Sequence, residues 1–231
     1  MLTKWVLSIS LLITTTGTSW AQRDTLNHLP DLRPRISSAI IPVVLTGYGF
    51  AALGWPSLKT FDLTVREEVW EDHPHTQFHL DNYLQYSPAA AVYILNAAGV
   101  KGWHDFRDRT LIYVTANIFL AVPVLSLKHF IKAARPDGSG DDGFPSGHTA
   151  TAFAAAEFMR LEFRQRSVWY GISAYTAAAG TAYLRIYNDK HWFSQLLTGA
   201  GIGILAAKAS YWLFPFIDRK ISHQPARQID L

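Results

Sequence analysis

Hydrophobic and polar residues occur in long alternating blocks along this chain. Residues 36–55 carry no charge, and about 20 uncharged residues are enough for a helix to cross the hydrocarbon core of a membrane. More apolar blocks follow, separated by charged segments: 83–100, 110–127, 149–163, 168–187 and 191–217. A globular all-α protein would show similar blocks, but it would need more charged faces to cover them. The pattern therefore predicts an all-α, polytopic membrane helix bundle with about six hydrophobic helices.

The polar segments divide the chain further. Residues 56–82 carry many charges and three histidines, so we expect an interfacial helix and a loop there, within an N-terminal group of helices spanning 36–100. Residues 101–217 form the candidate catalytic core. Residues 218–231 are expected to be a polar C-terminal tail.

The first residues have the features of a targeting segment. A basic residue, Lys4, precedes an apolar stretch at 5–13, and small residues stand at Ser19 and Ala21. This arrangement predicts a signal peptide at 1–21, cleaved after Ala21, followed by a polar linker at 22–35. An uncleaved anchor is the alternative, and both place the chain in or across a bacterial-type cell membrane.

Composition excludes several kinds of chemistry. The sequence has no cysteine, which rules out disulfides, thiolate metal sites and a cysteine nucleophile. The net charge is only +3, with Lys and Arg dispersed along the chain, which argues against a nucleic-acid partner. Anionic lipid or phosphate suits this charge better.

Two polar clusters at helix ends carry the candidate chemistry. The first cluster is a glycine-rich segment that ends at His148 and contains Lys128, Arg135 and Ser146. A lysine, an arginine fork and a helix N-terminus suit a tetrahedral phosphate. Arg185 and His191 lie between the last two apolar blocks. Antiparallel helices would bring both clusters together, where one neutral imidazole can attack phosphorus and a protonated one can donate to the leaving oxygen.

Three ordered segments carry a family resemblance. KHFIKAARP at 128–136 matches a K-x6-R-P motif, PSGH at 145–148 is intact, and LRIYNDKHWFSQ at 184–195 resembles S-R-x5-H-x3-D, with Leu184 and Gln195 replacing Ser and Asp. The chain thus resembles a bacterial membrane member of the type 2 phosphatidic acid phosphatases, in the lipid phosphate phosphatase and acid phosphatase-haloperoxidase superfamily.

The resemblance implies a role for each matching residue. His191 would be the nucleophile that forms a phosphohistidine, and His148 the general acid. The phosphate would be bound by Lys128, Arg135, Ser146, Gly147 and Arg185. The substrate would be a lipid phosphate within the membrane, and no metal or other cofactor is implied.

Gln195 is the departure that matters most. Four residues after His191, it should share a helix face with that ring and orient its far nitrogen, as the family's Asp does. A neutral amide leaves open a catalytically weak or inactive protein that only binds lipid phosphate. A vanadium-dependent haloperoxidase is a further alternative, which the apolar segments disfavour.

A metal site is a separate hypothesis. His75, His79 and Glu71 have i, i+4 spacing, but Pro74 interrupts a helix there, so solvated surface histidines are the favoured interpretation.

The positive-inside rule favours a periplasmic catalytic face, because the connections away from the motifs carry several cations: Lys101, Arg107, Arg109, Arg160, Arg164, Arg166, Arg219 and Lys220. A cleaved signal followed by six spans would give the opposite orientation.

Overall fold

The computed structural model describes residues 37–73 and 75–222. The predicted signal peptide at 1–21 and linker at 22–35 lie outside the described residues. Every regular element in the described part is helical, which confirms the predicted all-α class: α1 (Ser37–Gly54), α2 (Pro56–Arg66), η1 (Glu67–Glu71), α3 (Asp81–Leu84), α4 (Ser87–Ala97), α5 (Phe106–Ile131), α6 (Gly147–Phe163), α7 (Val168–Tyr187) and α8 (Phe193–Ser222). α8 continues five residues beyond the expected helix end at 217.

Three of these helices, α1, α5 and α8, are long and apolar enough to cross a membrane. α1 and α5 leave rows of large apolar side chains at least half exposed, which suits contact with lipid: Ile40, Ile41, Val43, Val44, Val114, Ile118, Val122 and Leu125. The apolar block at 83–100 differs from expectation, because it divides into α3 and α4. α4 has 11 residues, too few to span a bilayer.

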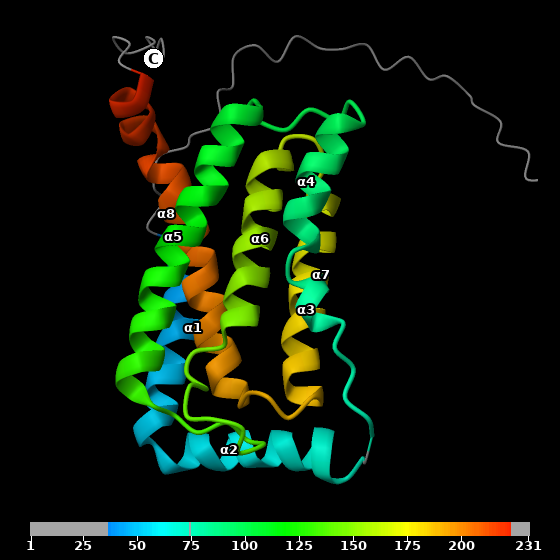
Figure 1. Ribbon diagram of the computed structural model, residues 1–231, viewed down its shortest axis with the longest axis vertical. Helices are drawn as coiled ribbons and strands as arrows, with labels where there is room; N and C mark the ends of the chain where they lie inside the picture. The colour runs from blue at the N-terminus through cyan, green and yellow to red at the C-terminus, as the bar shows by residue number, and fades with distance from the viewer. Residues whose placement is uncertain (1–36, 74, 223–231) are drawn as a thin grey trace, which may run out of the picture. The chain divides into compact units, whose positions relative to one another are not determined.

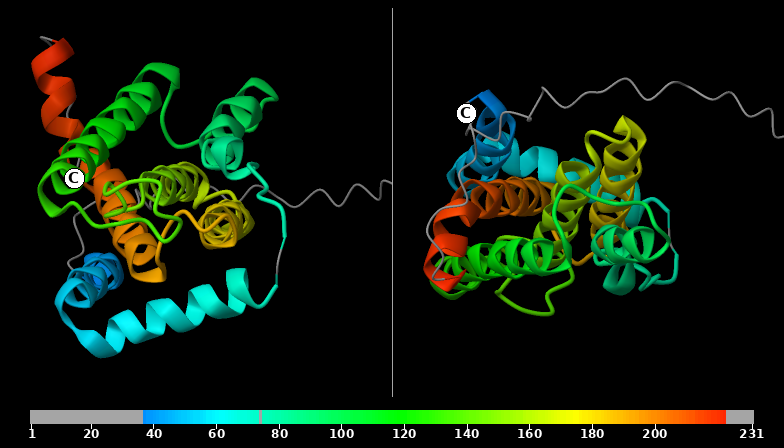
Figure 2. Two further views of the ribbon diagram at one scale, coloured as in Figure 1. Left: turned by 60° about the horizontal axis from the view of Figure 1, so that its bottom comes forward. Right: turned by 90° about the horizontal axis from the view of Figure 1, so that it is seen from above.

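The predicted interfacial helix corresponds to α2 with η1. α2 lies across the ends of the upright helices (Figure 1; Figure 2, left). Its buried Asp62 accepts hydrogen bonds from the backbone N–H of Ser194 at 2.9 Å and from the Ser194 hydroxyl at 2.5 Å. This carboxylate satisfies a donor in the first turn of α8, so α2 supports the start of that helix.

Helix α8 packs closely against α1, α5 and α6 (Figure 2, right). Small residues allow this approach. A Cβ built on Gly199 would lie 2.5 Å from the carbonyl oxygen of Ser146, and one on Gly203 would lie 2.2 Å from that of Ala150. The Gly199–Gly203 pair thus brings the backbones of α8 and α6 into contact, as small-residue pairs do where lipid gives no hydrophobic drive for association.

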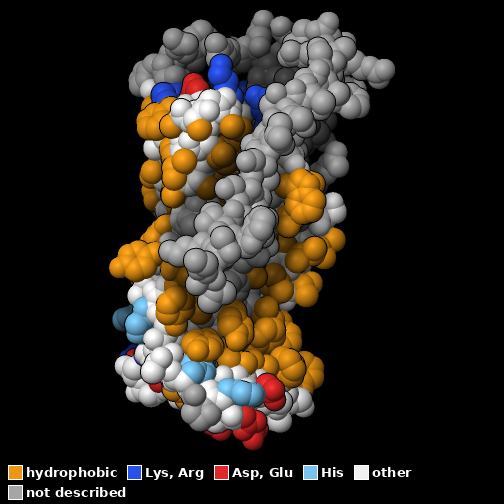
Figure 3. Space-filling view, turned by 90° about the vertical axis from the view of Figure 1, so that its right-hand side faces the viewer, with side chains coloured by type: hydrophobic (Ala, Val, Ile, Leu, Met, Phe, Trp, Pro, Cys, Tyr) orange, Lys and Arg blue, Asp and Glu red, His pale blue; other side chains and the backbone are white. Residues whose placement is uncertain are grey.

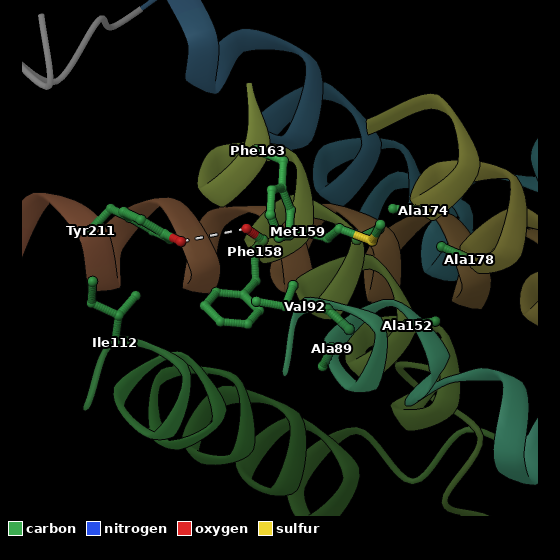
Figure 4. Close-up of a cluster of buried hydrophobic side chains, with 12 residues drawn as sticks. Ala89, Val92, Ile112, Ala152, Phe158, Met159, Phe163, Ala174, Ala178 and Tyr211 are labelled. Atoms are coloured by element: carbon green, nitrogen blue, oxygen red, sulfur yellow. Dashed lines mark hydrogen bonds between the residues drawn. The ribbon is translucent and has the colours of Figure 1, made fainter. Parts of the chain in front are cut away.

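The main apolar core surrounds α6. Phe158 and Phe163 are fully buried and pack with Val92 of α4 and Ile112 of α5 (Figure 4). The Tyr211 hydroxyl of α8 reaches the carbonyl oxygen of Phe158 at 3.4 Å and the Glu162 carboxylate at 2.7 Å. Ala174 and Ala178 of α7 complete this cluster, so the core ties five helices together.

The outer surface also separates polar from apolar side chains. On the flank seen in Figure 3, hydrophobic side chains spread over the part between the two ends, whereas histidine and acidic side chains gather at the lower end and Lys or Arg side chains at the upper end. An apolar band between two polar ends is typical of a protein that crosses a membrane.

The α6–α8 contact predicts the effect of one methyl group. We expect Gly203→Ala to lower the free energy of unfolding by about 1–3 kcal/mol, because the new Cβ must push α6 and α8 apart. Thermal unfolding in detergent measures this loss. Gly47→Ala is the matched control, since a Cβ there meets nothing within 4 Å. Equal unfolding temperatures for the two variants would contradict the proposed packing role.

Candidate functional site

His191 lies buried just before α8, with one ring nitrogen engaged. Its Nδ1 is 2.9 Å from the carbonyl oxygen of Gly143 and 3.0 Å from Oε1 of Gln195. Both partners are acceptors, so Nδ1 carries the hydrogen and donates it, which leaves the lone pair on Nε2. Gln195 thus lies next to Nδ1 of His191, as the four-residue spacing in the sequence predicts.

Gly143 is a contributor that the motifs did not indicate. Its N–H donates to the carbonyl oxygen of Ala133 at 2.8 Å, and a Cβ at this position would lie 2.8 Å from Nε2 of Gln195. The glycine therefore fits closely against Gln195 while its carbonyl holds the ring of His191. A backbone acceptor leaves no signature in side-chain chemistry, although a glycine two residues before PSGH was available as a hint.

Asp189, which lies near His191 in sequence, has a different partner. Its two carboxylate oxygens accept from Nε and Nη2 of Arg66 at 2.7 and 2.9 Å. This pair ties the end of α2 to the turn after α7. Asp189 is thus committed to Arg66, and the hydrogen bonds of His191 are made by Gly143 and Gln195.

The surroundings of His191 keep the ring neutral. Burial is the main cause of a pKa well below the usual value, the positive charge of Arg185 lowers it further, and the hydrogen bond to Gln195 offsets part of the effect. A neutral ring at physiological pH retains the Nε2 lone pair that nucleophilic attack requires.

One nitrogen of the Arg185 guanidinium is paired with a carboxylate, and another is buried without a hydrogen-bond partner among the described residues. Its Nη1 donates to the fully buried carboxylate of Asp81 at 2.6 Å. Its Nε is buried and has no hydrogen-bond partner among the described residues. A buried donor without a partner is costly, and an anionic oxygen would satisfy it.

Lys128 and Arg135 converge on one carboxylate. Arg135 binds Asp142 through Nε and Nη2 at 2.7 and 3.1 Å, and Lys128 bonds the backbone carbonyl of Asp142 with its Nζ 3.6 Å from the carboxylate. The hydrogen bond from Arg135 is the main reason that the pKa of Asp142 falls to about 2. Asp142 is therefore ionised at neutral pH. Its carboxylate lies against Arg135 and Lys128, where a bound phosphate would also have to lie.

His148 occupies the second position of α6. Its Nε2 lies 2.9 Å from Oδ1 of Asn82. Burial, and next the charge of Arg185, lower the pKa of His148 to about 4, so this ring is neutral at pH 7 unless a negative charge is bound beside it. A phosphate monoester would supply that charge and favour the protonated ring.

Ser146 and Gly147 form the start of α6. Ser146 is buried, and its hydroxyl oxygen accepts from the N–H of Thr149 at 3.5 Å and from the Thr149 hydroxyl at 3.0 Å, which makes it the N-cap. A Cβ on Gly147 would lie 4.0 Å from Cε of Lys128. The helix N-terminus therefore faces one of the candidate phosphate-binding cations.

A cavity of about 500 Å³ adjoins this cluster. It shares Gln195 and Ala133 with the support of His191, and its lining is largely apolar: Ala52, Leu53, Lys59, Asp62, Leu63, Ile131, Ala133, Ala134, Trp192, Ser194 and Gln195. It lies between the ends of α1 and α5, beside the residues that hold His191, and its size suits a small molecule or part of a lipid.

The histidines at 73–79 do not form a metal cluster. Among the described residues no group of three or more His, Asp or Glu side chains could hold a metal ion. His75 instead stacks on Tyr187, with ring centroids 3.6 Å apart, and its Nε2 bonds the Tyr187 carbonyl at 2.6 Å. This histidine links the interfacial segment to the end of α7.

Comparison with known proteins identifies relatives. Residues 109–219 match the PAP2 superfamily. The chain is 35% identical over 166 residues to lipid A 1-phosphatase from Porphyromonas gingivalis, covering 71% of this chain and 37% of that protein. It is 34% identical over 100 residues to lipid A 4'-phosphatase from Bacteroides thetaiotaomicron, covering 43% and 40%.

A solved structure is also similar. The transmembrane PAP2-type phosphatidylglycerolphosphate phosphatase from Bacillus subtilis aligns with a TM-score of 0.50 and 21% identity, over 78% of this chain and 97% of that one. This likeness concerns the helical fold. The chain spans less than half the length of the two curated relatives.

The position of Asp142 predicts competition with anions. We expect Asp142→Asn to tighten the binding of inorganic phosphate or orthovanadate about 5-fold to 10-fold, because an amide no longer neutralises Lys128 and Arg135. Calorimetric titration of the purified protein measures the change. Asp141→Asn removes the same charge one residue away, and an equal gain in that control would mean that overall charge alone is responsible.

Proposed function

We infer that this chain, which belongs to the PAP2 superfamily, is a membrane phosphatase acting on a phosphomonoester or diphosphate of a lipid. Its motifs resemble those of the type 2 phosphatidic acid phosphatases. The observation that carries the proposal is the neutral, buried His191, whose Nδ1 donates to two acceptors so that the lone pair of the ring lies on Nε2. The named activities of the two lipid A phosphatases make a lipid A phosphate the first substrate to test.

The proposed reaction has two steps. Nε2 of His191 attacks phosphorus, the bond from phosphorus to the leaving oxygen breaks, and His148 gives its proton to that oxygen. Water then gives a proton to His148 and its oxygen attacks phosphorus, the bond from Nε2 of His191 to phosphorus breaks, and inorganic phosphate leaves with His191 neutral and His148 protonated again. Gln195 and the Gly143 carbonyl keep the Nδ1 hydrogen in place while positive charge develops on the ring.

The cations stabilise the phosphoryl group in this scheme. Lys128, Arg135 and Arg185 supply positive charge, and the unpartnered Nε of Arg185 is a ready donor to a phosphate oxygen. The backbone N–H of Gly147 and the hydroxyl of Ser146 add neutral donors at the start of α6. Because groups of the protein itself supply all of this stabilisation, we expect turnover to need no metal ion.

We also propose that the site faces the periplasm. Arg107 at the start of α5 bonds Asp218 near the end of α8 at 2.9 Å, so these two helix ends lie together. That end carries Arg219 and Lys220 as well, and the positive-inside rule assigns it to the cytoplasm. His191 stands at the other end of α8 and would therefore meet lipids of the outer leaflet.

A binding protein without turnover is the second candidate, and Gln195 is the observation that favours it. The amide supplies no negative charge opposite the imidazolium that forms during attack. The Gly143 carbonyl oxygen weakens this argument against turnover, because it is a second acceptor 2.9 Å from Nδ1 of His191.

Replacement of the nucleophile tests the function. We expect His191→Ala to reduce lipid phosphate hydrolysis by several orders of magnitude and to abolish an acid-labile phosphoenzyme, because the variant lacks the proposed nucleophilic ring. Phosphate release from a panel of lipid phosphates, assayed in EDTA with purified protein, measures this loss. Hydrolysis by the variant at a near-normal rate would exclude His191 as the nucleophile, and absence of hydrolysis by the native protein would favour the binding protein.

Replacement of Gln195 by its charged isostere tests the role of the missing carboxylate. We expect Gln195→Glu to accelerate phosphohistidine formation about 10-fold, equivalent to about 1.4 kcal/mol, because the charge stabilises the imidazolium. The same charge raises the pKa of His191, so the acidic limb of the rate profile should move to higher pH, where the ring is again neutral. Rapid-quench measurement across pH gives both quantities. A Glu variant with an unchanged rate and profile would show that the acceptor's charge has no influence on this step.

A further inference from the structure

We propose that Asn82, which lies outside all three motifs, is a positioning residue that holds His148 for proton transfer to the leaving group. This inference rests on the proposed function. It concerns a residue 66 positions away in sequence from the histidine it contacts.

The first support is the contact itself. Oδ1 of Asn82 lies 2.9 Å from Nε2 of His148, and a carbonyl oxygen can only accept, so Nε2 carries a hydrogen in both the neutral and the protonated ring. Asn82 thereby limits rotation of the ring. It also leaves Nδ1 as the nitrogen whose protonation state changes.

The second support is the rigid anchoring of α3. The preceding residue, Asp81, is fully buried and accepts from Arg185 at 2.6 Å and from Nδ2 of Asn188 at 3.3 Å. Asn188 in turn bonds the backbone N–H and carbonyl of Phe78 at 2.7 and 2.9 Å. Asn82 is thus attached to the same frame that holds a phosphate-binding arginine, which fixes His148 and Arg185 relative to each other.

The third support is the charge around His148. Arg185 from α7, Lys128 from α5 and Arg135 from the following loop all disfavour its protonated form, whereas Asp81 from α3 favours it. Asn82 adds an acceptor on the favourable side without adding a charge. A general acid among three cations needs such an acceptor, because its protonated form must persist long enough to meet the leaving oxygen.

A comparison of leaving groups tests the proposal. An alkoxide leaving from a lipid phosphate needs a proton, whereas nitrophenolate leaving from p-nitrophenyl phosphate is stable without one. We therefore expect Asn82→Leu to lower kcat for the lipid phosphate about 10-fold to 100-fold, and for p-nitrophenyl phosphate less than about 3-fold. KM for the lipid should change little, since Asn82 contacts the acid rather than the cations.

The pH profile provides an independent readout. The alkaline limb of kcat reports loss of the His148 proton, so removing the acceptor in Asn82→Leu should move this limb to lower pH. Asn82→Asp places a carboxylate at the same position and should restore kcat with the limb moved to higher pH. Tyr83→Leu, the neighbouring change in α3 at a 76% exposed side chain, is the matched control and should leave both rates and the limb unchanged.

The outcomes separate the two proposals. If the native protein hydrolyses no lipid phosphate, the proposed function fails. If it does, but Asn82→Leu lowers the rates for both substrates equally, or changes neither rate nor the pH limb, the role of Asn82 is overturned while the phosphatase stands. Should the native protein reject p-nitrophenyl phosphate, opposite shifts of the limb in the Leu and Asp variants support the proposal and unshifted limbs refute it.

Discussion

The backbone contact between the starts of α6 and α8 is the constraint on which the site depends. The N–H of Ser146 donates to the carbonyl oxygen of Gln195 at 3.1 Å, and Gly199, one turn further along α8, leaves no room for a Cβ beside the carbonyl of Ser146. Two segments that are far apart in sequence are thereby joined through main-chain atoms. This contact fixes the positions of His148 and His191 relative to each other.

The same geometry would be unstable without compensation for its positive charge. Arg185 is paired with Asp81, Arg135 and Lys128 with Asp142, and Lys190 with Asp137. Breaking a buried pair leaves an uncompensated charge, which costs several kcal/mol. The pairs differ in accessibility, because the Asp81 side chain is fully buried whereas that of Asp142 is 50% exposed. An incoming anion can therefore replace Asp142 more readily than Asp81, which makes the first carboxylate exchangeable and the second structural.

Much of this fold could be predicted from sequence, because hydrophobic blocks determine helices over long stretches. The block at 168–187 became α7 with the same limits. The block at 83–100 was misjudged as one helix, since Pro88 at the start of α4 begins a new helix after the turn at Tyr86. The motifs indicated that Gln195 lies near His191, and Oε1 of Gln195 lies 3.0 Å from Nδ1 of that ring. They could not indicate Gly143, which acts through its carbonyl, or Asp81, whose partner is 104 residues away.

Most of the contacts that motifs miss come from one part of the chain, the interfacial segment at 56–82. Asp62 caps α8, Arg66 binds Asp189, and Asp81 binds Arg185, so this segment contacts residues on both sides of His191 in the sequence. It also borders the apolar cavity through Lys59 and Leu63. A segment that both supports the reacting groups and contacts the adjoining cavity can alter which lipid is accepted without altering the motif residues. Since such contacts depend on pairings across more than 100 residues, sequence motifs specify the chemistry of the site more fully than they specify its substrate.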